Sequence, residues 1–304
     1  MIVSASYRTD IPAFYAEWFQ ARFRAGFAHV ANPYGGPAYT VKLRQGVDGF
    51  VFWTRNARPF REALTEVAAA GIPFMIQYTV TGYPRPLEAA VVEAERSVAV
   101  IRDLAAAYGP RAMVWRYDPI LFTSLTPGTW HEATFARLAA ALEGAVDEAV
   151  ISFAGLYRKT ARNLAAAAAS HGFVWEDPPW EVKHRLRRRL ESIASRHGMV
   201  LTVCSQPEAG GQPARCVDAQ RLAEIAGRPF IARRKGNRPG CLCAESRDIG
   251  AYDTCPHGCV YCYAVTNREG AKVGYGRHDA GSGMLKPLPK KNAPETGRKL
   301  GEER

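Results

Sequence analysis

The sequence of 304 residues predicts an α/β fold with a parallel sheet, followed by a cysteine-rich region near the C-terminus. Short apolar runs alternate with segments of helical periodicity, and repeated β-α units specify parallel strands joined by right-handed crossovers. All seven cysteines lie at or beyond Cys204, so they mark a region apart from the alternating units. The apolar fraction of 47% is enough for a large core.

Six short runs predict the strands, because each is nearly continuous in apolar residues, as expected for strands covered on both faces. In chain order the runs are Ile2–Ser6, Phe50–Thr54, Phe74–Thr79, Met113–Tyr117, Ala149–Phe153 and Met199–Cys204. Six β-α units predict a TIM-like (β/α) barrel, partial or complete, and a flat doubly wound sheet is the alternative. In either architecture, functional residues are expected beyond the carboxyl ends of the strands.

Helical periodicity predicts the segments between the strands. These segments are Phe14–Phe23, Phe60–Ala70, Leu87–Tyr108, Trp130–Leu142, Ala161–Ser170 and Glu181–His197. Four of them precede a glycine, where a left-handed residue commonly ends a helix: Gly71, Gly109, Gly172 and Gly198. Asp10 is predicted to cap the first helix, with Pro12 in its first turn. A further short helix is predicted near Asp218–Ala226.

The alternation fades after residue 205, which predicts three parts of the chain. Residues 1–205 are expected to form the barrel domain. Residues 206–284 are expected to form a cysteine-rich, cluster-binding region that packs on the barrel and is held by metal more than by secondary structure. Residues 285–304 form a basic tail whose composition predicts disorder.

Polar side chains follow several of the predicted strands. Arg8 and Asp10 follow the first strand, and Arg116 and Asp118 lie at the end of the fourth. Because the carboxyl ends of parallel strands meet at one rim, we expect these four residues to be the catalytic candidates. Two simpler interpretations stay open: Asp10 only caps a helix, and Arg116 only pairs with Asp118.

The net charge of +11 is compatible with nucleic-acid binding, since Lys and Arg release counterions from phosphates. The alternative is that the charge reflects an Ala-, Arg- and Gly-rich composition together with the basic tail. The run Lys183–Arg189 is basic at helical spacing, which is usually a solvated face and is the first place to test for phosphate contacts. The sequence has no phosphate loop of the type G-x-x-x-x-G-K-[ST] and no G-x-S-x-G elbow.

The sequence has no run of 18 or more apolar residues, so no membrane span is expected. The N-terminal segment is too short and too soon charged for a secretion signal, which predicts a cytoplasmic protein. An odd number of cysteines in such a protein argues against a disulfide framework and favours metal binding.

Cys255, Cys259 and Cys262 lie in one short loop, at a spacing that suits zinc or an iron–sulfur cluster. A structural zinc site usually needs four closed ligands. His257 could be the fourth, but its imidazole would be difficult to turn onto the same metal within so tight a loop. Three thiolates without a fourth ligand are what a [4Fe–4S] cluster with one open iron requires.

The pattern C-x-x-x-C-x-aromatic-C, with Tyr261 in the aromatic position, resembles the radical S-adenosylmethionine superfamily. Three further stretches resemble an uncharacterised bacterial family, domain of unknown function 1848. They are Ser4–Pro12, Tyr117–Ile120, and Cys241–Cys255 together with Tyr263 and Ala264. This second resemblance covers nearly the whole chain.

The resemblance implies a [4Fe–4S] cluster on Cys255, Cys259 and Cys262, with S-adenosylmethionine bound at its open iron. It also implies cleavage of that cofactor to a 5′-deoxyadenosyl radical, which removes hydrogen from an unknown substrate. Electrons would come from a reductant such as flavodoxin or ferredoxin. The residue that matches Tyr261 lies near the adenine. The other candidate cofactor contacts are Ser4, Ser6, Thr54 and Asn56, and the superfamily's Gly-Gly-Glu is absent.

The position of the cysteine loop departs from the superfamily pattern. In most radical S-adenosylmethionine enzymes the cluster loop follows the first barrel strand, whereas here it follows the last. A circular permutation would reconcile the two orders. The segment Tyr263–Glu269 would then be the helix after the cluster loop and would lead to the strand Ile2–Ser6.

The four remaining cysteines are the right number for a second [4Fe–4S] cluster or, less favoured, a structural zinc. They are Cys204, Cys216, Cys241 and Cys243. The alternative is that Cys204 is a buried apolar residue and that the others are incidental. Two other functions stay open: a non-enzymatic zinc or iron–sulfur protein that binds nucleic acid, and a radical enzyme that acts on nucleic acid in the manner of a spore photoproduct lyase.

Overall fold

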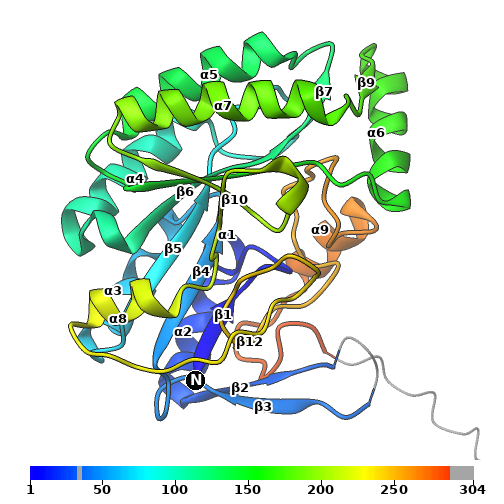
Figure 1. Ribbon diagram of the computed structural model, residues 1–304. Helices are drawn as coiled ribbons and strands as arrows, with labels where there is room; N and C mark the ends of the chain where they lie inside the picture. The colour runs from blue at the N-terminus through cyan, green and yellow to red at the C-terminus, as the bar shows by residue number, and fades with distance from the viewer. Residues whose placement is uncertain (33–35, 288–304) are drawn as a thin grey trace, which may run out of the picture.

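The computed structural model describes residues 1–32 and 36–287, and its centre is a parallel sheet of eight strands (Figure 1). The strands, in chain order, are β1 Ile2–Ala5, β4 Gly49–Thr54, β5 Phe74–Thr79, β6 Met113–Ile120, β8 Glu148–Phe153, β10 Val200–Val203, β11 Gln212–Pro213 and β12 Ser246–Asp248. The first six confirm the six predicted strands. They lie side by side in the order β10-β8-β6-β5-β4-β1, and β12 pairs with the other edge of β1, which confirms an α/β fold built on one large parallel sheet.

Helices surround the sheet (Figure 1). They are α1 Ile11–Phe14, α2 Ala16–Ala25, α3 Arg61–Ala69, α4 Ala94–Tyr108, α5 Gly128–Leu142, α6 Arg158–His171, α7 Trp180–Arg196, α8 Ala219–Ala226 and α9 Arg268–Gly276, with short 3₁₀ turns η1 Arg58–Phe60, η2 Pro110–Ala112 and η3 Pro207–Ala209. The predicted cap at Asp10 is confirmed, because Asp10 accepts a hydrogen bond from Ala13 N at 3.0 Å and Pro12 lies in the first turn of α1. All four predicted glycines have positive φ, and Gly172 is left-handed as predicted, but Gly109 has a ψ of 151° and is not left-handed helical.

Two helix predictions are wrong at their boundaries. The helix predicted over Leu87–Tyr108 starts at Ala94, because the preceding residues bond to a distant loop instead. The amide of Val260 donates to the carbonyl of Leu87 at 3.1 Å. The helix predicted over Tyr263–Glu269 begins only at Arg268, where the side chain of Asn267 caps it.

Two small strand pairs were not predicted. An antiparallel hairpin joins β2 Phe27–Val30 to β3 Tyr39–Lys42, and β7 Phe122–Thr123 pairs with β9 Trp175–Glu176. Both pairs lie outside the main sheet.

The two faces of the sheet are covered by different parts of the chain. Phe50, Phe52 and Trp115 pack in the main core beneath the helices. Val51 and Val114, which alternate with them, pack on the opposite face in a second apolar cluster. We call this opposite side the inner face. Burial on both faces explains why the strands are continuous apolar runs.

The two edge strands come from one stretch of chain. β11 pairs with β10 and β12 pairs with β1, and within the described residues no pairing joins β11 to β12 to close a barrel. Residues 214–245, which we call the crossing segment, connect these edges. The segment runs in front of the sheet in Figure 1, from α8 at the lower left toward β12, and it supplies residues to the inner-face cluster.

Helix α8 covers the amino-terminal end of the inner face. A Cβ atom at Gly49 would lie 3.2 Å from the Leu222 side chain, so the glycine permits the close approach of helix and strand. The buried guanidinium of Arg221 forms ion pairs with Asp147 at 2.8 Å and Glu148 at 2.7 Å. These contacts fix the crossing segment to β8 and the turn before it.

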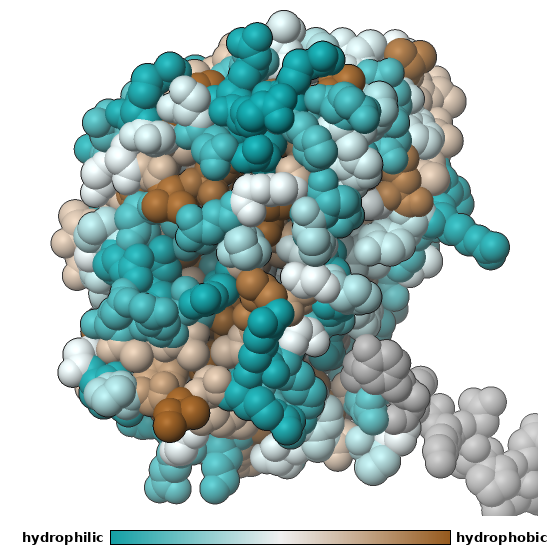
Figure 2. Space-filling view, in the orientation of Figure 1, coloured by the Kyte–Doolittle hydropathy of each residue, from teal (hydrophilic) through white to brown (hydrophobic). Residues whose placement is uncertain are grey.

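None of the helices in the described ranges combines the length and apolar character needed to cross a membrane. Of the predicted basic tail, residues 288–304 lie outside the described residues, and Leu285 is buried in the main core. Hydrophilic side chains gather at the top of the face in Figure 2, over α5 and α7. In the predicted basic run of α7, Arg185, Arg188 and Arg189 are exposed, but Lys183 is buried against Asp177.

A buried histidine in α5 predicts acid lability of the fold. The Nε2 of His131 donates to the carbonyl of Leu121 at 3.0 Å, so Nδ1 accepts from the Tyr117 hydroxyl at 2.9 Å. Burial lowers the pKa of His131 to about 4. The unfolded chain therefore binds an extra proton below about pH 6.5, and stability falls from there toward pH 4 by roughly 3 kcal/mol.

We expect His131→Gln to have a shallower dependence of unfolding free energy on pH between 6.5 and 4, measured by urea titration, although it is less stable at neutral pH. His171→Gln, which removes an exposed imidazole, is the control. An unchanged slope in His131→Gln would contradict the prediction.

Candidate functional site

The carboxyl-terminal half of the inner face is polar. Side chains alternate between the two faces along each strand, so the residue two positions after each apolar inner-face residue also points to the inner face. These residues are Ser4, Trp53, Gln77, Arg116 and Ser152. Several of these side chains contact one another. Trp53 Nε1 donates to Ser4 Oγ at 3.0 Å, and the Arg116 guanidinium lies over the Trp53 ring at 5.1 Å. Strand ends from β1 to β8 therefore meet at one rim, as the sequence predicts.

Arg116 and Asp118 form an ion pair at 2.6 Å, as the simpler interpretation of these two residues expects. They also contact other residues, so the pair is more than an isolated ion pair. Asp118 also accepts from Ser152, and Arg116 also donates to Gln77 Oε1 at 3.1 Å. Burial alone would raise the pKa of Asp118, but the Arg116 charge and these hydrogen bonds hold it below its ordinary value. The pair is thus an ionised, fully hydrogen-bonded unit.

Ser4 and Ser6 both bond to a residue that the sequence reasoning missed. They donate to the two carboxylate oxygens of Asp248 in β12, at 2.9 and 2.7 Å. Asp248 also accepts from the amides of Tyr7 and Gly250. Arg8 lies beside the same carboxylate, with Nε 3.6 Å from Oδ1. No sequence pattern marked Asp248, because only the pairing of β12 with β1 brings it there.

Thr54 and Asn56 lie apart from this group. The Thr54 side chain points to the same face as Phe50 and Phe52, away from the inner face. Its Oγ1 accepts a hydrogen bond from the amide of Asn56 at 2.9 Å. Asn56 Oδ1 in turn accepts from the amide of Arg58 at 3.1 Å. The two side chains therefore shape the turn into η1.

The loop with Cys255, Cys259 and Cys262 follows β12 and lies beyond the carboxyl ends of the strands. All three cysteines line one cavity of about 270 Å³. Gly258, between them, has a φ of 73°, and a Cβ atom there would collide with the guanidinium of Arg268. A glycine is therefore required for this tight turn.

Asp10 and His257 hold the cysteine loop to the sheet. His257 Nε2 lies 2.8 Å from Asp10 Oδ2, and the same carboxylate oxygen accepts from the amide of Arg55 at 2.7 Å. Asp10 is thus a helix cap and an anchor at once, so the interpretation as a cap alone is incomplete. His257 Nδ1 is buried and has no hydrogen-bond partner among the described residues. The amide of Ala90 donates to the carbonyl of His257 at 3.0 Å.

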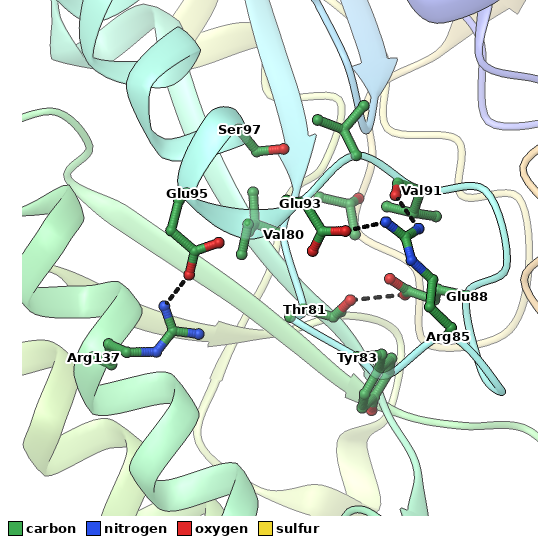
Figure 3. Close-up of a pocket in the computed structure, with 14 residues that line it drawn as sticks. Val80, Thr81, Tyr83, Arg85, Glu88, Val91, Glu93, Glu95, Ser97 and Arg137 are labelled. Carbon is green, nitrogen blue, oxygen red and sulfur yellow. Dashed lines mark hydrogen bonds and ion pairs between the residues drawn. The ribbon is translucent and has the colours of Figure 1, made fainter.

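A second buried network holds Tyr261. Glu88 forms an ion pair with Arg55 at 2.8 Å and accepts from Thr81 Oγ1 at 2.7 Å and from the Tyr261 hydroxyl. Figure 3 shows Glu88 and Thr81 in the wall of a small polar cavity of about 120 Å³ between β5 and α4. The sequence reasoning missed Glu88 because it fell in a predicted helix, and it missed Arg55 in favour of its neighbours Thr54 and Asn56.

Burial dominates the electrostatics of the three cysteines. It raises the pKa of Cys255 well above its ordinary value and that of Cys259 to about 12. A metal ion would therefore have to displace protons from these thiols. In the described ranges no three or more His, Cys, Asp or Glu side chains are arranged as a complete metal-binding group. Binding would require the thiol side chains to reorient.

The other four cysteines lie together in the inner-face region. Cys204, Cys216 and Cys243 are buried in the inner-face cluster, and Cys241 packs against it half-buried. The Cys204 and Cys216 sulfurs are 3.5 Å apart. The structure thus forms two groups of cysteines, one beyond the strand ends and one where the crossing segment packs on the inner face.

Comparison with known families finds one that covers most of the chain. The model described as domain of unknown function (DUF1848) matches residues 2–264. Comparison with curated protein sequences finds no match.

The buried Arg55–Glu88 pair predicts a large stability difference between two similar substitutions. Glu88→Gln leaves the Arg55 charge buried without its partner and should lower the unfolding free energy by roughly 3–5 kcal/mol. Asp103→Asn removes the exposed pair with Arg61 and should cost about 1 kcal/mol or less. Urea unfolding measures both, and equal effects would contradict the burial argument.

Proposed function

The chain belongs to the DUF1848 family, and from the geometry of its cysteine loop we propose that it is a radical S-adenosylmethionine enzyme. The observation that carries this proposal is the position of Cys255, Cys259 and Cys262. They lie on one loop beyond the carboxyl ends of parallel strands and line one cavity, whose other walls come from residues 85–89 and from α6. Functional sites of barrel-like parallel sheets lie at this end.

The strand order supports a circularly permuted barrel. β12 is the parallel neighbour of β1, so in space the order begins β12-β1-β4-β5. The cysteine loop and then α9 follow β12 along the chain. Counted from β12, the loop follows the first strand, as it does in most members of the superfamily. We propose that the sheet is a partial TIM-like barrel opened between β11 and β12.

The donor set suits the proposed group. Three thiols on one short loop would hold three irons of a [4Fe–4S] cluster. With such a cluster reduced by a flavodoxin- or ferredoxin-type partner, the site would supply one electron for cleavage of S-adenosylmethionine to methionine and a 5′-deoxyadenosyl radical, which takes hydrogen from a substrate. The protein's own residues bind, orient and exclude water.

The rim residues have distinct roles in this proposal. Asp10 positions the cysteine loop through His257, and Glu88 and Arg55 position Tyr261. Ser4, Ser6 and Arg8 fix the strand end through Asp248. The Arg116–Asp118 pair lies in the wall of the rim and is the candidate for contacting substrate. Asp10 is therefore a positioning residue in this proposal and not a direct catalyst.

One observation favours a second candidate, a non-enzymatic zinc module. His257 has a carboxylate on Nε2 and a buried, unpartnered Nδ1 among the described residues. Histidines that bind metal commonly donate their other nitrogen to a carboxylate in this way. A closed Cys₃His zinc site would then leave no open coordination position, and the basic surface would serve nucleic-acid binding.

The radical proposal predicts that anaerobically reconstituted protein, given dithionite and S-adenosylmethionine, forms 5′-deoxyadenosine. Cys255→Ala, Cys259→Ala and Cys262→Ala should each reduce the product to background, because each removes one of three iron ligands. Chromatography of the products measures this, with Asp103→Asn as a folded, active control. Protein that holds iron and sulfide yet never cleaves the cofactor would refute the proposal.

The substitution His257→Gln separates the two candidates. Gln keeps a donor for Asp10 but supplies no nitrogen ligand in place of Nδ1. If the site holds an open cluster, the variant should retain iron, sulfide and cofactor cleavage. If it is a closed zinc site, wild-type protein should contain zinc without sulfide, and the variant should bind zinc at least tenfold more weakly. Salt-sensitive binding to oligonucleotides would then support the module.

A further inference from the structure

Three cysteines of the crossing segment meet Cys204 of the strand end after β10, where the segment packs on the inner face. Cys204 follows β10, Cys216 follows β11, and Cys241 and Cys243 lie near the end of the crossing segment. The Cys204 and Cys216 sulfurs are 3.5 Å apart. Cys243 lies close enough to both Cys216 and Cys241 for their thiols to interact. The four thiols therefore lie close together, and their side chains would have to rotate to surround one metal, because within the described residues they do not form a complete metal-binding group.

Nitrogen donors point at three of the four sulfurs. Arg116 Nη1 lies 3.0 Å from Cys216 Sγ, and Arg238 Nη2 lies 3.5 Å from Cys204 Sγ. The backbone amide of Val217 donates to Cys243 Sγ at 3.3 Å. A thiol is a weak acceptor, whereas a thiolate accepts strong, charge-assisted bonds from a guanidinium. These donors would stabilise thiolate ligands once a bound metal has displaced the thiol protons.

Burial makes uncompensated thiolates costly at this place. Cys216 is 2% exposed and Cys243 4%, among apolar neighbours such as Val51 and Val114. Several anions in such surroundings need a cation among them. Four thiolates around one divalent metal, or around one iron–sulfur cluster, keep a net negative charge that the two guanidinium groups offset.

We propose that Cys204, Cys216, Cys241 and Cys243 bind a second metal centre with four thiolate ligands. This centre ties the crossing segment to the inner face, between α8 and β12. A zinc ion and a [4Fe–4S] cluster share this ligand chemistry, and metal analysis distinguishes them. The proposal does not depend on the radical chemistry, because its ligands are separate from Cys255, Cys259 and Cys262.

The test removes the other three cysteines. A full-length protein with Cys255→Ala, Cys259→Ala and Cys262→Ala should still hold metal, either about one zinc without sulfide or about four iron with about four sulfide per chain. Adding Cys241→Ser and Cys243→Ser should remove that metal. The proposal would be overturned if the triple variant contained no metal, or if the variant with all five substitutions still contained it. A Cys204–Cys216 disulfide without metal would overturn it too.

A measurement on wild-type protein covers the case in which a variant does not fold. Chelation of the loaded protein should expose the four cysteines to alkylation together and in step with metal release, as followed by peptide mass spectrometry. Trypsin should then cleave the crossing segment faster at Arg233, Arg234 and Lys235. Alkylation of Cys204 and Cys243 before any metal leaves would contradict the proposal. Loss of cofactor cleavage alone would bear only on the other site.

Discussion

The buried carboxylate of Asp248 is the contact on which the arrangement of both cysteine groups depends. It accepts from Ser4, Ser6 and two backbone amides, and so joins the first strand to the last. A buried carboxylate is stable only when its oxygens are satisfied in this way. Because β12 is held beside β1, the loop that follows it lies beyond the strand ends, and the segment that precedes it must cross the inner face.

Sequence patterns predicted the six central strands because those strands are apolar on both faces, and the helix ends because Asp10 and the glycines have local backbone roles. β12 escaped prediction because Ser246–Asp248 is polar and short. The same limit applies to the site. Arg116 and Asp118 could be placed at the rim from strand position alone, whereas Glu88 and Asp248 reach it only through long-range contacts. The sequence analysis predicts Thr54 as a cofactor contact and not Arg55, although the alternation of side chains along β4 turns Arg55 toward the inner face and Thr54 away from it.

The interior links the two cysteine groups through ordinary contacts. The Arg116 guanidinium donates to Cys216 and lies over the Trp53 ring. Trp53 donates a hydrogen bond to Ser4, which donates one to Asp248. Asp248 lies on the strand that leads to the cysteine loop. The polar half of the inner face is therefore one packed layer, with one cysteine group beyond the strand ends and the other where the crossing segment packs on the sheet.

The chain order of the sheet also dictates an order of assembly during synthesis. β1 is made first, yet its outer edge gains its partner only when residues 246–248 have been made, after all the other strands of the sheet. Until then the nascent sheet carries an unpaired edge, and such edges invite pairing with other chains. The four cysteines at the crossing segment have all been made by residue 243, just before β12, whereas the cysteine loop is complete only at residue 262. Completion of the sheet and assembly of both candidate metal sites are therefore late events of synthesis, so a chain that stops before β12 would have an exposed β1 edge and would lack the cysteine loop.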